Sequence, residues 1–218
     1  MTNPPVPPAP PGAPAPTRRD GEATRQRLLR AALELYTTNG LRATTTPEIA
    51  SRAGVAEGTI YRHFTSKEHL LNEVYRGSQR WALALLRDIE ESEKGAKTPD
   101  RLSRLARRLF EAAERDPAAV RMLLLVREDR ALDDKSRATA REFREALQHL
   151  VASGKSDGLV RPGPADLWAS VWLNLIAFAA EKVASKEWTP DHPHLNLVVE
   201  SAWAAVSGRG AAEMLPAQ

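Results

Sequence analysis

The sequence predicts an all-α protein with an N-terminal three-helix helix-turn-helix domain and a larger C-terminal helical domain. Apolar residues recur every three or four positions along most of the chain after residue 19, which is the spacing of one face of an α-helix. No segment shows the alternation of apolar and polar residues that is typical of a β-strand. Residues 44–71 hold two short helical patterns separated by a glycine, as in a helix-turn-helix.

The composition is that of an ordinary globular protein. The chain has 218 residues, of which 42% are hydrophobic and 27% are charged. Because it has no cysteine, disulfides, thiolate metal sites and cysteine nucleophiles are excluded. No apolar run approaches the roughly 18 residues needed to cross a bilayer, and the N-terminus lacks the basic residues and apolar core of a signal peptide. We therefore expect a cytoplasmic protein without a membrane partner.

Positive charge is concentrated near the N-terminus. Residues 17–67 carry nine basic and five acidic side chains, a net +4, whereas the whole chain carries only +3. A basic first quarter joined to a nearly neutral remainder is typical of a nucleic-acid-binding head on a separate body. A solvated, arginine-rich helix face is the alternative that charge alone leaves open.

Both ends of the chain are expected to lie outside the folded domains. Residues 1–16 contain eight of the sixteen prolines and no charged residue, so they cannot form a helix or bury a core. We expect a disordered Pro-rich tail over residues 1–18, although a ligand for a proline-binding partner stays open. A flexible C-terminal tail is expected over residues 209–218.

The expected head domain, residues 19–66, contains three helices. Gly40 follows the first helix and Gly54 follows the second. Each glycine can take the left-handed conformation that ends a helix. The second helix has Thr45 or Thr46 as its N-cap and a proline in its first turn. The three helices are expected over residues 20–38, 46–53 and 57–64.

The expected body, residues 67–208, begins with a long helix that carries an apolar stripe from Leu70 to Ile89. Residues 122–126 are all apolar, so the helix that contains them should be buried. A loop is expected over residues 154–164. Further helices are expected over residues 100–115, 117–130, 135–152, 165–185 and 193–207.

The helix-turn-helix segment separates apolar from polar residues. Small and apolar side chains lie where the two helices must pack together, and Gly54 lies in the turn. The polar residues that remain outside are Thr45, Thr46, Glu57, Thr59, Tyr61, Arg62, His63 and Lys67. Hydroxyl groups near a helix N-terminus and basic side chains are suited to bind phosphate oxygens.

This segment resembles the DNA-binding head of the tetracycline-repressor (TetR) family. The resemblance covers roughly residues 23–75 and depends on the groups Ile49-Ala50, Ala53-Gly54-Val55, Gly58-Thr59-Ile60-Tyr61, Phe64, Ser66-Lys67-Glu68 and Leu70-Leu71. It implies a homodimer that binds palindromic double-stranded DNA as a transcriptional repressor. It also implies that a small-molecule effector, bound in the C-terminal ligand-binding and dimerisation domain, releases the DNA.

The resemblance also implies roles for individual residues. Phosphate contacts are expected from Thr46, Tyr61 and Lys67. Base contacts are expected from Thr45, Pro47, Glu57, Gly58, Thr59 and Arg62. Pro47 departs from the family pattern, because it cannot donate a hydrogen bond where other members have a longer polar side chain. Thr46 could instead only cap its helix, and Tyr61 could partly pack.

The helix expected over residues 165–185 carries two apolar stripes, so it should contact two partners. One stripe holds Trp168, Trp172, Leu175 and Ala179, and the other holds Leu167, Val171 and Phe178. The resemblance implies that the first stripe and the last helix pair with a second subunit, through Trp168, Leu175, Ala179, Leu195, Val198, Val199, Ala202, Trp203 and Val206. An ordinary monomeric core is the alternative.

The second stripe is expected to help line an effector cavity. The candidate lining residues are Trp81, Met122, Val126, Phe143, Leu147, Trp172, Asn174 and Phe178. Because few of them are polar, the expected effector is largely apolar or aromatic. Asn174 and Glu181 lie on one helix face and could hydrogen-bond it. An apolar stripe of this kind is more often plain core than cavity lining, and Glu181 could equally be an exposed residue at the helix end.

No enzyme signature is present. The sequence lacks a GxxxxGK phosphate loop, a dinucleotide glycine fingerprint and an HExxH motif. His192-Pro193-His194 has no further nearby ligand, so we interpret it as a loop rather than a metal site. We expect no catalysis, no cofactor and no metal. The alternative function is a helical ligand-binding or adaptor module without sequence-specific DNA binding.

Overall fold

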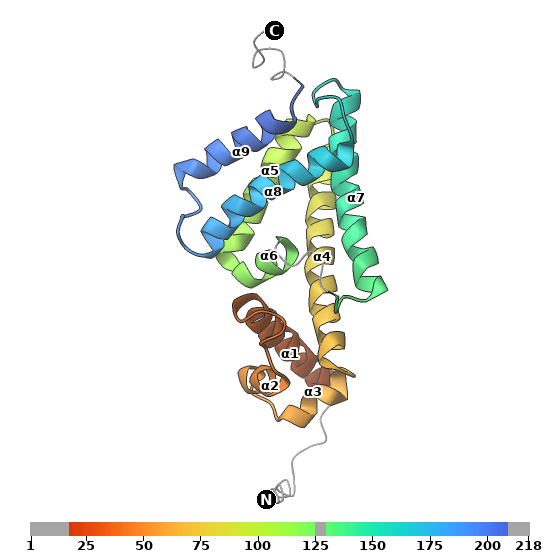
Figure 1. Ribbon diagram of the computed structural model, residues 1–218, viewed down its shortest axis with the longest axis vertical. Helices are drawn as coiled ribbons and strands as arrows, with labels where there is room; N and C mark the ends of the chain where they lie inside the picture. Colours follow the sequence, from red (N-terminus) through yellow and green to blue (C-terminus); the bar gives the residue numbers. More distant parts are fainter. Residues whose placement is uncertain (1–17, 125–129, 209–218) are drawn as a thin grey trace, which may run out of the picture.

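The computed structural model describes residues 18–124 and 130–208, which form nine helices and no strand (Figure 1). One antiparallel bridge, between Val160 and Ser207, is the only β-type pairing within these ranges. The predicted all-α fold is therefore confirmed. Of the tails predicted over residues 1–18 and 209–218, all but Arg18 lie outside the described residues, and Arg18 begins α1.

The head consists of α1 (Arg18–Thr38), α2 (Thr46–Ala53) and α3 (Glu57–His63). Its core is closed by buried apolar side chains from all three helices and from the start of the next one: Leu28, Tyr36, Ile49, Ile60, Phe64 and Leu70. Gly54 ends α2 with a φ of 65°, in the left-handed region that the turn was predicted to need. The second helix has the predicted bounds.

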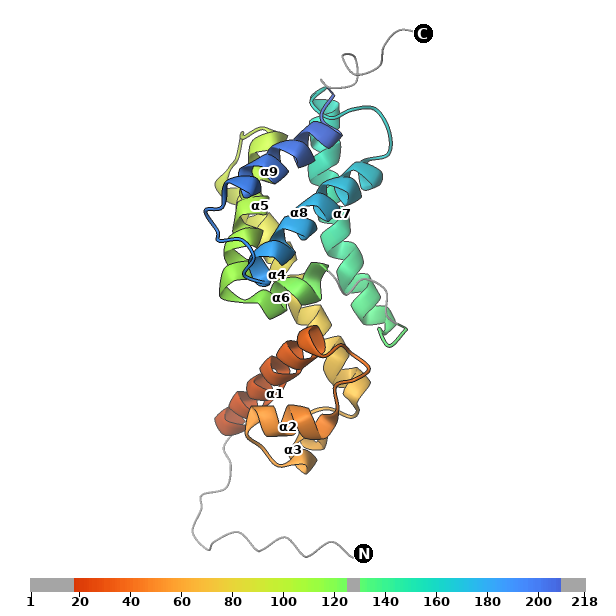
Figure 2. The ribbon, with the colours of Figure 1, turned by 60° about the vertical axis from the view of Figure 1, so that its left-hand side comes forward.

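Helix α4 (Lys67–Ser92) joins the head to the body. Figures 1 and 2 show α1–α3 at one end of the molecule and α4 running from this end along the body. Ser66 caps α4 by accepting a hydrogen bond from the backbone of His69. Its first turns pack into the head core through Leu71 and Val74, and its later turns pack into the body core through Leu86 and Ile89.

The body is a packed set of helices around one core. Its remaining members are α5 (Thr98–Arg115), α6 (Pro117–Leu124), α7 (Asp134–Ser156), α8 (Ala165–Ala184) and α9 (Pro193–Val206). Helix α8 packs against α5, α6, α7 and α9, and α8 and α9 lie side by side in both views (Figure 2). Trp172 and Ile176 of α8 are buried at its centre.

Helix α7 is longer than predicted because Gly154 does not break it. A Cβ atom at this position would lie 2.7 Å from the hydroxyl oxygen of Thr98, so the glycine allows α5 to approach α7 closely. The helix continues to Ser156, and the predicted loop over residues 154–164 is correspondingly shorter. Helix α5 begins two residues earlier than predicted, with Pro99 in its first turn.

Helix α8 is apolar enough to cross a membrane by length and composition, although no such segment was expected from the sequence. With 20 residues and a mean hydropathy of 1.3 in its most apolar window, it meets the length and composition of a membrane-spanning helix. Many alanines raise its hydropathy without forming a long run of large apolar residues. Because the helix is covered by four others, the same composition also suits the core helix of a helical protein.

Candidate nucleic-acid interface and body cavity

The residues predicted to contact DNA all lie at the surface of the head. All ten are exposed or half-buried, and none belongs to the core. Tyr61 is the most exposed large apolar side chain of α3, at 55%. Its hydroxyl group lies 3.4 Å from that of Thr46, at the start of α2. The helix-turn-helix therefore brings the two hydroxyl groups together across 15 positions of sequence.

The two adjacent threonines of α2 have different roles. Thr45 is the N-cap: its hydroxyl accepts a hydrogen bond from the backbone of Glu48, and its own backbone N–H donates to the Glu48 carboxylate at 2.7 Å. These bonds from Thr45 hold the pKa of Glu48 below its ordinary value. Thr46 has no part in this capping box, so its hydroxyl is available at the surface beside Tyr61.

Lys67, at the start of α4, is held against the loop that precedes α2. Its ammonium group donates to the carbonyl oxygen of Arg42, at 3.4 Å. Its own carbonyl oxygen accepts a hydrogen bond from the hydroxyl of Tyr36, which is buried in the head core. The first turn of α4 is thus fixed to α1, and the lysine lies beside the loop between α1 and α2.

A cavity of about 310 Å³ opens between α4, α6, α7 and α8. Three of the predicted ligand-binding residues, Phe143, Leu147 and Asn174, line it. Tyr75 and Gln79 of α4 also line it, and they were missed at the sequence level. Their spacing of four residues along α4 was the available signal, because two polar groups at this spacing lie on one face of a helix.

The other predicted lining residues do not meet in this cavity. Trp81 lines a separate groove of about 600 Å³ between α1, α4 and the α5–α6 corner. Met122 is buried with the head core, and Trp172 is buried in the body core. Phe178 is 53% exposed and packs against Trp188, with 5.8 Å between ring centres. Val126 lies outside the described residues.

The two predicted stripes of α8 do not face the partners that were expected for them. Leu167 and Phe178, expected beside a cavity, are about half exposed, whereas Ala179, expected at a subunit interface, is fully buried within its own chain. Leu195, Ala202 and Val206 of α9 are buried in the same way. Of the predicted interface residues, those at the surface are half-buried: Trp168, Leu175, Val198, Val199 and Trp203. Helical spacing tells which residues share a helix face, but it does not tell which face packs against the chain's own core.

Glu181 and the histidines have structural partners. The Glu181 carboxylate accepts two-pronged hydrogen bonds from Arg121, at 2.8–3.1 Å, so it is not free to bind a guest. His192 is the N-cap of α9, as expected for a loop, and its ring stacks on Trp188 with centres 5.3 Å apart.

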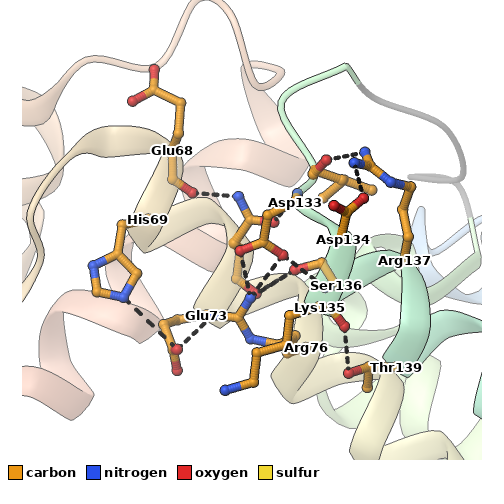
Figure 3. A network of polar contacts seen from close by, with 12 residues as sticks. Glu68, His69, Glu73, Arg76, Asp133, Asp134, Lys135, Ser136, Arg137 and Thr139 are labelled. Atoms are coloured by element: carbon orange, nitrogen blue, oxygen red, sulfur yellow. Dashed lines mark hydrogen bonds and ion pairs between the residues drawn. The ribbon is translucent and has the colours of Figure 1, made fainter.

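A polar network joins the head, α4 and the start of α7 (Figure 3). At its centre the Arg76 side chain, only 3% exposed, donates to Glu73 at 2.6 Å, to Asp133 at 3.0 Å and to Ser136 at 2.9 Å. Glu73 also pairs with Arg25 of α1, at 3.0 Å. Burial alone would raise the pKa of Glu73, but the hydrogen bonds and charges of Arg76 and Arg25 hold it below the ordinary value.

Comparisons with known proteins agree with the assignment of the head as a helix-turn-helix domain. Residues 28–74 match the family model described as "Bacterial regulatory proteins, tetR family". The HTH-type transcriptional repressor KstR2 of Mycolicibacterium smegmatis is 32% identical over 144 residues, which cover 63% of this chain and 68% of that protein.

KstR2 of Mycobacterium tuberculosis is 42% identical over 96 residues, 44% of this chain; the match spans about half of that relative, 47%. A TetR family transcription regulator from Marinobacter aquaeolei has a similar fold, with a TM-score of 0.76 at 22% identity over 88% of this chain and 100% of that one.

Proposed function

This chain belongs to the TetR family of bacterial regulatory proteins, and on that premise we propose that it is a cytoplasmic transcriptional repressor released from DNA by a small molecule. The observation that carries the proposal is the pair of hydroxyl groups from Thr46 and Tyr61 at the surface of the head, together with the Lys67 ammonium group beside Arg42. Hydroxyl and ammonium groups at two helix ends are suited to hold phosphates while α3 lies in the major groove.

The proposed operator is palindromic, because the repressor is proposed to be a homodimer. Supporting this, α8 and α9 expose large apolar side chains on the side away from the core, among them Leu167, Phe178 and Leu197. Apolar groups on two neighbouring helices are suited to form a four-helix bundle with a second copy. Each subunit would then supply one α3 to one half-site.

The proposed effector site is the cavity lined by Phe143, Leu147 and Asn174. Helix α4 connects this cavity to the head, since Tyr75 lines the cavity and the adjacent Arg76 holds the polar network. Arg25, which pairs with Glu73, also lies over the Phe64 ring, 5.4 Å from its centre. Phe64 directly follows α3, so a shift of α4 would reach the end of the recognition helix.

Footprinting on the DNA upstream of the protein's own gene tests this function. The expected result is two protected half-sites whose centres lie about one helical turn, roughly 34 Å, or a modest multiple apart. A single protected half-site would contradict the dimeric arrangement. The absence of any protected site at low salt would favour the alternative, a helical adaptor or ligand-binding module that does not read DNA.

A further inference from the structure

The wall of the body cavity formed by α4 carries two buried polar groups without a protein partner. Tyr75 and Gln79 are only 1% and 4% exposed, and both line the cavity. Within the described residues, no hydrogen bond is formed by the Tyr75 hydroxyl or the Gln79 side-chain amide. Leaving a buried polar group unpaired is costly, so these two groups need water or a guest in the cavity as a hydrogen-bond partner.

Both groups are reachable from the cavity. In the part of the chain that the structure describes, the only side-chain nitrogens or oxygens that are sealed from solvent and unpaired are Nε of Arg76 and Nε of Arg101. The Tyr75 hydroxyl and the Gln79 amide are therefore open to whatever fills the cavity. Water can satisfy them in the empty protein, and a guest that displaces this water must replace its hydrogen bonds.

The two groups can act on one atom of a guest. They lie four residues apart on α4, so their side chains are neighbours on one face of the helix. Burial raises the pKa of the Tyr75 hydroxyl, which therefore keeps its proton and can donate it. The Gln79 amide donates through its nitrogen. Two neighbouring donors suit an oxygen with two lone pairs.

The rest of the cavity lining is mixed, because apolar side chains lie beside the polar side chains of Gln148, Ser170 and Asn174. Leu123, Phe143, Leu147 and Leu173 supply apolar side chains from three other helices. The volume of about 310 Å³ is at the lower end for small-molecule sites. The charged side chains of the lining, Arg141, Arg144, Glu145 and Asp166, balance in sign, so the cavity has no excess charge to select an ion.

We propose that the effector is a compact, neutral and mostly apolar molecule with one carbonyl oxygen, which accepts hydrogen bonds from Tyr75 and Gln79. The regulatory role of the bound molecule rests on the proposed function, whereas its binding in the cavity does not. It differs from the sequence expectation in its polar anchors, because Asn174 and Glu181 were the candidates there and the two donors on α4 were not recognised.

Binding of matched bicyclic probes tests the proposal. The probes are 1-tetralone, which has the carbonyl oxygen, and tetralin, the same ring system without it; each is titrated into the full chain by calorimetry, without DNA. The wild-type protein is expected to bind tetralone about tenfold or more tightly than tetralin, because a site built to hydrogen-bond a group rejects the analogue that lacks it. The Tyr75→Phe, Gln79→Leu double variant is expected to lose this preference.

Tyr36→Phe is the matched control, because it removes a buried hydroxyl from the head rather than from the cavity. It should keep the preference for tetralone, and melting curves establish that each variant is folded. Equal binding of the two probes by the wild type, a preference that survives in the double variant, or binding of neither probe at millimolar concentration would overturn the proposal. A tetralone complex that leaves DNA affinity unchanged would count against effector-controlled release, not against the assigned ligand class.

Discussion

Arg76 of α4 and Asp133, the N-cap of α7, form an ion pair across 57 positions of sequence, with nitrogen–oxygen distances of 3.0 and 3.1 Å (Figure 3). The arginine is buried and Asp133 is half exposed. Because Arg76 also binds Glu73, one guanidinium connects the helix that leaves the head with a helix that lines the cavity.

Replacing Arg76 by methionine is expected to destabilise the protein. The change leaves Glu73 without its closest partner, and breaking a buried pair costs about 3–5 kcal/mol; partial exposure of both acids places the cost at the lower end. Urea unfolding measures it. Arg108→Met is the matched control, because its 3.4 Å pair with Asp88 is exposed and should be worth about 1 kcal/mol or less. Equal losses in the two variants would contradict the importance of the network.

The network also predicts an acid-sensitive part of the stability. The pKa of Glu73 is lower in the folded chain than its ordinary value, so the folded state favours the ionised carboxylate. This contribution is complete above the unfolded pKa, about 4.3, and is lost as the pH falls through the lower folded pKa. Comparing unfolding free energies at neutral and acidic pH should therefore show a smaller loss in Glu73→Gln than in the wild type. An identical loss would exclude Glu73 as a contributor.

Two glycines in helices should respond oppositely to alanine. Gly154→Ala places a methyl group 2.7–2.8 Å from three atoms of Thr98 and is expected to cost about 1–3 kcal/mol. Gly77→Ala meets no atom within 4 Å in the middle of α4 and should stabilise the protein by up to about 1 kcal/mol. Thermal melting of both variants is the measurement. A stable Gly154→Ala would show that α5 and α7 can move apart freely.

The neighbouring threonines Thr45 and Thr46 are expected to separate stability from DNA affinity. Thr45→Ala removes the capping box of α2 and should cost about 1 kcal/mol of stability. Thr46→Ala removes no capping bond, so it should leave stability nearly unchanged and weaken binding to all DNA sequences alike. Melting curves and DNA titrations of the two variants distinguish the roles. Loss of stability in Thr46→Ala would return that residue to a structural role.

The proposed dimer interface predicts an effect of charge on the exposed face of α8 and α9. Phe178→Glu and Leu197→Glu put a carboxylate on a face where apolar side chains are 53% and 57% exposed. Sedimentation equilibrium should show weaker dimers for both, because an interface would have to bury the charge. Ala84→Glu, on an exposed face of α4, is the control and should change nothing. A dimer constant unaffected by either α8 or α9 variant would contradict this interface.

The sequence predicted the head more completely than the body, and the reason is local chemistry. The bounds of α2, a threonine cap at Thr45 or Thr46 and the turn at Gly54 follow from residues next to each other in the chain. Which stripe of α8 faces the core, and the role of Gly154, depend on helices distant in sequence. Periodicity gives the angle between side chains on one helix but not the position of its neighbours. Tyr75 and Gln79 were missed for the same reason.

The salt dependence of DNA binding by the wild type and by Lys67→Ala tests the central claim most directly. A labelled duplex carrying the protected upstream site is titrated with each protein over a range of salt concentrations. The account predicts a specific, salt-sensitive complex, which Lys67→Ala weakens on all sequences while lowering the slope of log affinity against log salt by about one. A wild-type protein that binds this duplex no better than an unrelated one, or that shows no salt dependence, would contradict the assignment of the head as a DNA-binding domain.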